Sequence, residues 1–167
     1  SRTPGKAEAF ARDFGFEKAY NSYEAMLQDP AVELVYITTP HSHHYEQMML
    51  CLEHGKHVIC EKAFTMNADQ ARKVREFAAQ KGLYVAEAIW TRYMPSRQMI
   101  DEIIKSGVIG SVNTLTANLS YNIAYKSRIM EPALAGGALL DIGIYGLNFA
   151  LMHFGDDIEK IESSVRM

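Results

Sequence analysis

Three short apolar segments recur along the chain at intervals of about 25 residues, and a helix-forming stretch that ends in glycine separates each pair. The segments span residues 34–37, 57–60 and 84–88, and the glycines are Gly55 and Gly82. A strand, a crossover helix and a parallel strand in this order build right-handed units that share one sheet. The pattern therefore predicts an α/β fold, and the uninterrupted apolar run in 34–37 predicts a strand that is covered on both faces.

The pattern changes after Trp90. Residues 112–123 alternate between apolar and polar side chains, which is typical of an antiparallel strand with one polar face. The pair Gly136-Gly137 precedes a long apolar helix, and a second alternating segment begins near Ile158. These features predict that an α+β part of the chain begins at about residue 90.

Composition excludes several classes of partner. The net charge is −3 and no block of basic residues occurs, so nothing favours nucleic-acid binding. No uninterrupted apolar run approaches the roughly 20 residues that cross a membrane, so we expect no membrane partner. Cys51 and Cys60 have neither a disulfide framework nor a metal-ligand spacing around them. They predict reduced core thiols in a cytoplasmic protein.

Glu61 and Lys62 follow directly after the apolar segment 57–60. Proteins of the α/β class place their chemistry at the carboxyl ends of parallel strands, so this acid–base pair is a candidate for catalysis. Two interpretations are open. The pair is either an exposed salt bridge at a strand end, or it supplies a lysine that positions a substrate hydroxyl and tunes a neighbouring acid.

Asp141 and Tyr145 are polar residues in the apolar helix that follows Gly136-Gly137. They are four residues apart, so an α-helix places both side chains on one face. One interpretation is a buried pair that satisfies its own hydrogen bonds, and the other is that Tyr145 accepts a proton. A lysine ammonium about 4 Å from the phenol favours the phenolate by up to about 4 kcal/mol at an effective dielectric constant of about 20. This is sufficient for general-base catalysis.

Histidines cluster at His41, His43 and His44, after a segment that ends in Thr39-Pro40. The cluster is compatible with a metal site, with a His44 that faces a ligand from the first turn of a helix, or with an ordinary surface. We assign no metal to it.

An aromatic and basic loop lies at the junction of the two parts and carries Trp90, Arg92 and Tyr93. This loop either packs a hinge or forms a wall of a substrate site. In the second case the aromatic faces contact a sugar or another ring, and the arginine contacts hydroxyl groups.

Five motifs occur in register along the chain: Ser1-Arg2 with the helix KAEAFARDFG, then VYITTPHSHHYE, GKHVICEKA, EAIWTRYMP and GGALLDIGIY. In this order they resemble the Gfo/Idh/MocA family of oxidoreductases, and most of all its dihydrodiol dehydrogenase and D-xylose dehydrogenase branch. Tyrosine rather than histidine at position 145 indicates this branch. The resemblance covers essentially the whole chain.

The resemblance implies a partial Rossmann-like parallel sheet in residues 1–89 and part of an α+β substrate and dimerisation domain, with an antiparallel sheet, in residues 90–167. It implies an NAD(P)-dependent oxidoreductase that transfers a hydride between a hydroxyl-bearing carbon of a sugar or cyclic diol and nicotinamide. The implied cofactor is NADP or NAD. The implied assembly is a homo-oligomer formed through the C-terminal sheet.

The same resemblance implies roles for individual residues. Lys62 and Tyr145 are the catalytic lysine and the acid/base, and Asp141 orients substrate hydroxyls. The residues expected to contact cofactor are Arg2, Thr38, Thr39, Pro40, His44, Glu61, Lys62, Trp90 and Arg92. The residues expected to contact substrate are Lys62, Trp90, Arg92, Tyr93, Asp141 and Tyr145. Arg2 matches the position that meets an adenosine 2′-phosphate, which favours NADP.

The chain departs from the family in two ways. Ala63 stands where the family usually has proline, which argues against a cis peptide bond after Lys62, because a non-proline cis bond costs about 3 kcal/mol. No G-x-G occurs, so we expect the phosphate-binding turn in a longer protein of which this chain is a fragment, and we expect the fragment alone to be inactive.

Two other functions remain open at the level of residues. One is a non-catalytic module of the same fold that binds a sugar, a nucleotide or a protein, since folds carry many functions. The other is a metal-dependent hydrolase that uses the histidine cluster.

Overall fold

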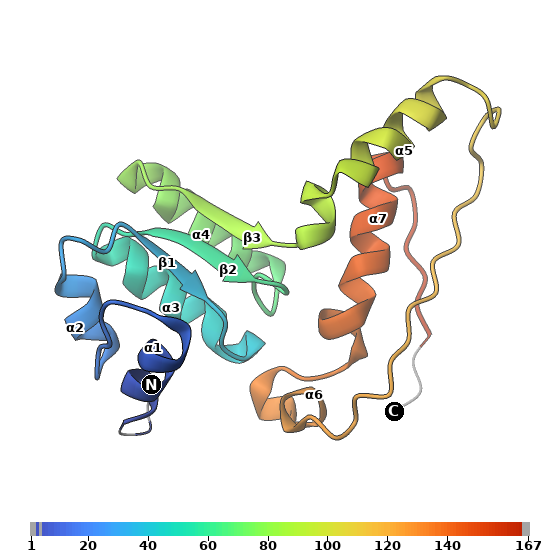
Figure 1. Cartoon of the computed structure of the whole chain (residues 1–167). Coiled ribbons are helices and arrows are strands. Elements are labelled where there is room, and N and C mark those ends of the chain that lie inside the picture. The colour runs from blue at the N-terminus through green and yellow to red at the C-terminus, as the bar shows by residue number, and fades with distance from the viewer. Residues whose placement is uncertain (1–2, 4, 165–167) are drawn as a thin grey trace. The chain divides into compact units, whose positions relative to one another are not determined.

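The computed structural model describes residues 3 and 5–164 (Figure 1). The chain forms two compact units, Ser1–Ala88 and Ile89–Met167, and each unit is described by itself.

The first unit is an α/β unit around a three-stranded sheet. Its elements, in order, are α1 (Lys6–Phe14), α2 (Tyr23–Gln28), β1 (Leu34–Ile37), α3 (His41–Glu53), β2 (His57–Glu61), α4 (Ala68–Lys81) and β3 (Val85–Ala88). The strand order is β1-β2-β3, and both pairs are parallel. The predicted parallel sheet is therefore confirmed. Right-handed crossovers place α3 and α4 on the same face of this sheet (Figure 1).

The core of this unit lies between the sheet and the two crossover helices. Its buried members are Leu27, Ile37, Met48, Cys51, Leu52, Val58, Cys60, Val74 and Ala78. Along β2, Val58 and Cys60 point into this core while the alternate side chains are half-buried. On β1, Leu34 and Tyr36 are 46% and 53% exposed. The expectation that this strand is covered on both faces is therefore wrong for the described part of the chain, because both crossovers pack on one face.

Both cysteines belong to this core and are free thiols. Burial raises the pKa of the Cys51 thiol to about 11. Burial, with the nearby Glu87 and Glu61 carboxylates, raises the pKa of the Cys60 thiol further. A thiol with a raised pKa carries little thiolate and is a poor nucleophile. The predicted role of the cysteines as core thiols is confirmed.

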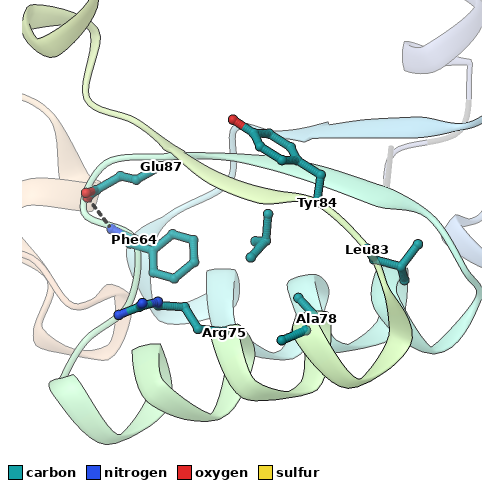
Figure 2. Close-up of a pocket in the computed structure, with 8 residues that line it drawn as sticks. Phe64, Arg75, Ala78, Leu83, Tyr84 and Glu87 are labelled. Atoms are coloured by element: carbon teal, nitrogen blue, oxygen red, sulfur yellow. Dashed lines mark hydrogen bonds between the residues drawn. The ribbon is translucent and has the colours of Figure 1, made fainter.

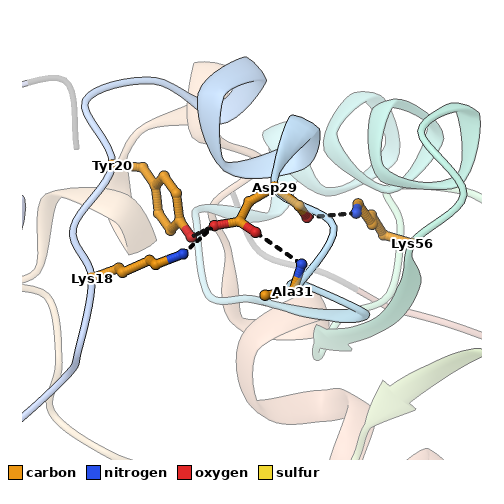
Figure 3. Close-up of polar contacts among 5 residues, drawn as sticks. All are labelled: Lys18, Tyr20, Asp29, Ala31 and Lys56. Atoms are coloured by element: carbon orange, nitrogen blue, oxygen red, sulfur yellow. Dashed lines mark hydrogen bonds and ion pairs between the residues drawn. The ribbon is translucent and has the colours of Figure 1, made fainter.

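Asp29 organises the turn between α2 and β1 (Figure 3). Its Oδ2 atom accepts hydrogen bonds from Lys18 Nζ and Tyr20 Oη, both at 2.7 Å, and its Oδ1 atom accepts from the Ala31 N–H at 2.8 Å. Its backbone carbonyl accepts from Nζ of the buried Lys56 at 2.9 Å, which fixes the approach to β2. The hydrogen bonds from Lys18, Tyr20 and Ala31 hold the pKa of Asp29 well below its usual range.

This network predicts an acid-sensitive contribution to stability. The pKa of Asp29 is lower in the folded state than the value of about 3.9 expected when unfolded. Its contribution is therefore complete above about pH 4 and is lost as the pH falls toward the folded-state value. We expect Asp29→Asn to lower the free energy of unfolding at neutral pH and to flatten its decline below about pH 4, measured by urea denaturation across pH.

The control for this experiment is Asp13→Asn, which removes the same charge from an exposed position on α1. The Asp29 variant should lose stability relative to this control at neutral pH, and the two should converge in acid. Parallel curves for the two variants at every pH would contradict the prediction.

The second unit is largely helical. Its elements are the 3₁₀ turn η1 (Trp90–Tyr93), α5 (Pro95–Lys105), α6 (Ser127–Met130), the 3₁₀ turn η2 (Pro132–Leu134), the π-helical turn η3 (Leu139–Gly143) and α7 (Ile144–Phe154). Residues 112–123 and the segment around Ile158 follow irregular paths, although both were expected to be strands. A strand is defined by its ladder of hydrogen bonds to a neighbour. No described segment pairs with either stretch, so alternation alone does not make them strands.

The stretch Pro132–Phe154 is, among the described residues, the one that is long and apolar enough by composition to cross a membrane. Our expectation rested on uninterrupted apolar runs and did not detect it, because polar residues divide the stretch. One such helix is weak evidence, since a core helix of a globular domain passes the same test. Three of its polar side chains pair with side chains of the same unit: Asp141 with Arg128, Asn148 with Arg92, and His153 with Asp101. These pairs tie the stretch to its own unit, while 17% of its apolar window is buried within the structure.

Candidate active site

Several of the predicted site residues of the first unit lie at the carboxyl edge of the sheet. Ile37 pairs with Cys60 and Glu61 pairs with Ala88, so the strands end at the same edge. Thr38, Thr39 and Pro40 leave β1 there, and Lys62 leaves β2. Thr39 Oγ1 donates to Gln47 Oε1 at 2.7 Å, which ties this loop to α3.

Glu61 is held by its neighbours. One carboxylate oxygen accepts a hydrogen bond from the Tyr36 hydroxyl, and the other accepts from the Lys62 N–H at 3.3 Å. The bond to Glu61, followed by burial, raises the pKa of Tyr36 to about 12, so Tyr36 remains a donor through the neutral range. Glu61 therefore lies at the predicted edge with a fixed orientation that the adjacent strand supplies.

Two contacts hold the segment that follows Lys62, and a third joins His44 to the loop after β1. His44 is fully buried, and its Nδ1 lies 2.8 Å from the Ala63 carbonyl oxygen while its Nε2 lies 2.8 Å from the Thr39 carbonyl oxygen. The Phe64 N–H donates to Glu87 Oε1 at 2.9 Å (Figure 2). The Lys62–Ala63 peptide bond is cis, so the argument against a cis bond at this position was wrong.

His44 was expected to face the cofactor, and its role there stays a prediction. What the structure shows is that both ring nitrogens face backbone carbonyls. A neutral imidazole carries one N–H, so it donates to one of these carbonyls, whereas a protonated ring donates to both. A ring that donates to both carbonyls connects the loop after β1 to the segment after Lys62, and it thereby helps to fix the lysine's backbone.

A pocket of about 400 Å³ lies between β3 and α4 (Figure 2). It is lined by Phe64, Arg75, Ala78, Ala79, Leu83, Tyr84, Val85 and Glu87. It is largely apolar and Lys62 is not among its lining residues, so this pocket is not the predicted site.

In the second unit, the junction loop and α7 are joined by two hydrogen bonds. Trp90 Nε1 donates to the Tyr145 hydroxyl oxygen at 3.1 Å, and the two rings meet edge to face with centroids 6.2 Å apart. Arg92 Nε donates to Oδ1 of the buried Asn148 at 2.7 Å. Tyr93 is 68% exposed. The structure thus brings Trp90 and Arg92, both predicted site residues, onto the helix that carries Tyr145.

Asp141 is buried, and its Oδ1 atom accepts from Arg128 Nη1 at 2.8 Å. It lies in the π-helical turn η3, before α7 begins at Ile144. The expected α-helix is therefore replaced by a π-helical turn at Asp141, and the placement of Asp141 and Tyr145 on one face stays a prediction. The close approach to α6 requires glycine at position 136, where a Cβ would collide with the Ile129 carbonyl.

Sequence reasoning missed Asn148 and Arg128. Asn148 left a signal, because it is a polar residue in an apolar helix, three positions after Tyr145. Arg128 left no such signal, because it lies in a short helix that has no recognisable periodicity in the sequence. Arg2 lies outside the described residues. Lys62 belongs to the first unit and Tyr145 to the second.

The histidine cluster gives no support to a metal centre. Within residues 3 and 5–164, no group of three or more histidine, cysteine, aspartate or glutamate side chains is arranged to hold a metal ion. His41 and His44 are buried, and their rings meet edge to face with centroids 5.7 Å apart.

The fold and site define a class of protein. Residues 1–88 match the model of the oxidoreductase family with an NAD-binding Rossmann fold, and residues 98–167 match the C-terminal domain of the same Gfo/Idh/MocA family. The chain belongs to the Gfo/Idh/MocA oxidoreductase family, as the five motifs predicted.

Individual relatives agree with this assignment. The chain is 46% identical, over 96% of its length, to D-xylose 1-dehydrogenase (NADP(+)) of Hypocrea jecorina, of which it covers 45%. It is 40% identical, over 93% of its length, to human trans-1,2-dihydrobenzene-1,2-diol dehydrogenase, of which it covers 46%. The chain also matches a crystal structure of the 3-ketoreductase KijD10 from Actinomadura kijaniata in complex with TDP-benzene and NADP, with a TM-score of 0.76 and 27% sequence identity. The match covers 94% of this chain and 47% of the KijD10 chain. The chain therefore spans about half the length of the relatives it matches.

Thr38 to Pro40 and Lys62 directly follow β1 and β2, at the carboxyl ends of parallel strands. Dinucleotides bind at this edge in open α/β sheets, so the position of these residues is compatible with a nicotinamide cofactor. The glycine-rich turn that holds the pyrophosphate is not in this sequence.

Proposed function

We propose that the complete protein is an NADP- or NAD-dependent dehydrogenase that acts on a hydroxyl-bearing carbon of a sugar or a cyclic diol. The observation that carries the proposal is the position of the Tyr145 hydroxyl at the start of α7. The Trp90 indole nitrogen, which can only donate, lies 3.1 Å from the hydroxyl oxygen and orients it. A phenol oriented in this way suits proton transfer. The names of the relatives support the substrate class.

In this proposal Tyr145, as the phenolate, takes the proton from the substrate hydroxyl while the carbon loses a hydride and a carbonyl forms. Lys62 donates a hydrogen bond to the reacting oxygen and favours the phenolate by its charge. Asp141, fixed by Arg128, orients a second hydroxyl. In the reverse direction the Tyr145 hydroxyl protonates the carbonyl oxygen.

The residues proposed to hold the cofactor are Arg2, Thr38, Thr39, Pro40, His44, Glu61, Lys62, Trp90 and Arg92. The nicotinamide, when bound, supplies the two-electron acceptor for the hydride. Trp90, Arg92 and Tyr93 are also proposed as a wall of the substrate site, since the Trp90 ring is 56% exposed beside Tyr145.

We also propose that residues 1–89 and 90–167 are parts of two domains, that the complete protein is cytoplasmic, and that it forms a homo-oligomer through its C-terminal sheet. The different local structure of the two parts supports the boundary, and the buried free thiols support a reducing compartment.

The test of this function uses the complete protein with NADP⁺ and two substrates, D-xylose and trans-1,2-dihydrobenzene-1,2-diol, each carrying deuterium at the carbon that is oxidised. We expect the label to appear in the reduced nicotinamide for at least one substrate, with a primary isotope effect. Binding of NADP⁺ and sugar without transfer of the label would favour the non-catalytic module instead.

A further inference from the structure

We propose that the Trp90 indole N–H favours the phenolate form of Tyr145 and thereby prepares this tyrosine as a base. Trp90 then acts as a positioning residue, in addition to any contact with substrate. This inference rests on the proposed role of Tyr145, and it adds a source of phenolate stabilisation that lies entirely within residues 89–167.

The Trp90–Tyr145 hydrogen bond has a fixed direction. An indole nitrogen has one N–H and no lone pair to offer, so at 3.1 Å it donates and the Tyr145 oxygen accepts. A phenol can accept this bond in either state. The bond becomes charge-assisted, shorter and stronger when the acceptor is a phenolate. A donor that binds the ionised form more strongly favours that form.

The charges near Tyr145 also affect the phenolate. Asp141 precedes Tyr145 by about one turn, and a lone carboxylate there would oppose the phenolate. Arg128 pairs with Asp141 at 2.8 Å and offsets its charge. Arg92 brings a second guanidinium to Asn148, less than one turn beyond Tyr145. The described charges around the phenol therefore permit the effect of the indole N–H.

Another group of charges lies at the far end of α7. Asp101 on α5 pairs with His153 at 2.8 Å and with Arg97 at 3.6 Å. His153 is eight residues beyond Tyr145, which is about 12 Å along a helix. Tyr93 shares the η1 turn with Trp90 but is mostly exposed. The Trp90 N–H, by contrast, acts directly on the Tyr145 oxygen.

The test replaces Trp90 in the complete protein with its benzothiophene analogue, in which sulfur takes the place of the N–H and the ring size is kept. Trp90→Phe is the second variant. Isotope-labelled tyrosine lets NMR follow each phenol, and Tyr145→Phe assigns the resonance of Tyr145. We expect its titration to move by roughly one pH unit in the alkaline direction in both Trp90 variants.

The same variants should shift the pH dependence of kcat equally, so that kcat falls about tenfold below this limb. KM should change little in the benzothiophene variant, which keeps the size of the ring. Tyr125, which is 78% exposed in the same unit, supplies the control resonance and should not move. An unmoved Tyr145 titration in the folded benzothiophene variant would overturn the inference, even if kcat fell.

The two proposals fail separately. Full turnover by Tyr145→Phe would refute the proposed function of Tyr145, whereas the NMR titration would still measure the effect of the Trp90 N–H on the phenol. Conversely, Tyr145 could prove catalytic while its titration does not change in the Trp90 variants. That result would leave the proposed function unaffected and refute this inference alone.

Discussion

Replacing Tyr145 with phenylalanine in the complete enzyme is expected to lower kcat by about a hundredfold to ten-thousandfold, which is the usual contribution of a positioned general base. The substitution removes one oxygen and keeps the ring, so α7 should fold as before. Its edge-to-face contact with Trp90 should also remain, since that contact needs only the ring. KM for the substrate should change much less than kcat, because the lost interaction is one that matters when the proton moves.

The measurement is steady-state oxidation of D-xylose or the trans-diol by NADP⁺, with cofactor binding followed separately by fluorescence. Tyr121→Phe is the matched control, since it removes the same oxygen from a ring that is 64% exposed in the same unit. Undiminished kcat in the Tyr145 variant would remove tyrosine from the mechanism. A loss of cofactor binding equal to the loss of turnover would assign Tyr145 to binding instead.

Replacing Lys62 with methionine is expected to lower kcat by roughly a hundredfold or more and to raise KM. The ammonium is proposed both to hold the reacting hydroxyl and to favour the phenolate, and a preorganised charge of this kind is commonly worth two to three orders of magnitude. Methionine has a similar length and lacks the charge. Its cost to folding should be small, because His44, Glu61 and Glu87 hold the backbone around position 62.

The control is Lys62→Arg, which keeps the charge and changes the geometry of the donors. We expect it to recover the low KM more fully than kcat, because a guanidinium can bind the hydroxyl but places its charge differently. Addition of small alkylamines should restore part of the activity of the methionine variant. Wild-type kinetics in Lys62→Met would show that the lysine takes no part in catalysis.

The sequence predicted most of the first unit, because a parallel sheet is built from local signals. Apolar runs, glycine stops and the spacing between them located β1, β2 and β3 and the two helices between them. The same signals placed Glu61 and Lys62 at a strand end. What they did not predict was which face of β1 is covered, since both crossovers pack on the same side of the sheet.

The second unit was harder to predict because its expected elements depend on distant partners. Residues 112–123 alternate as a strand does, yet a strand exists only where another segment supplies hydrogen bonds. Asp141 was expected in an α-helix, and the structure has a π-helical turn at this point. Arg128 and Asn148 became visible as site residues only through their contacts with Asp141 and Arg92.

By itself, the sequence determined the order of the strands and helices around the sheet, the family, and the identity of Lys62, Asp141 and Tyr145 as candidates, because these depend on periodicity and motifs that are local in the chain. Only the tertiary structure decided what each candidate contacts. Glu61 is held by Tyr36 from another strand, and Asp141 is paired with Arg128 from another helix. Trp90, 55 residues before Tyr145, donates to its oxygen. Such contacts join residues that are far apart in sequence, and hydrogen-bond geometry depends on fractions of an ångström that no local pattern encodes.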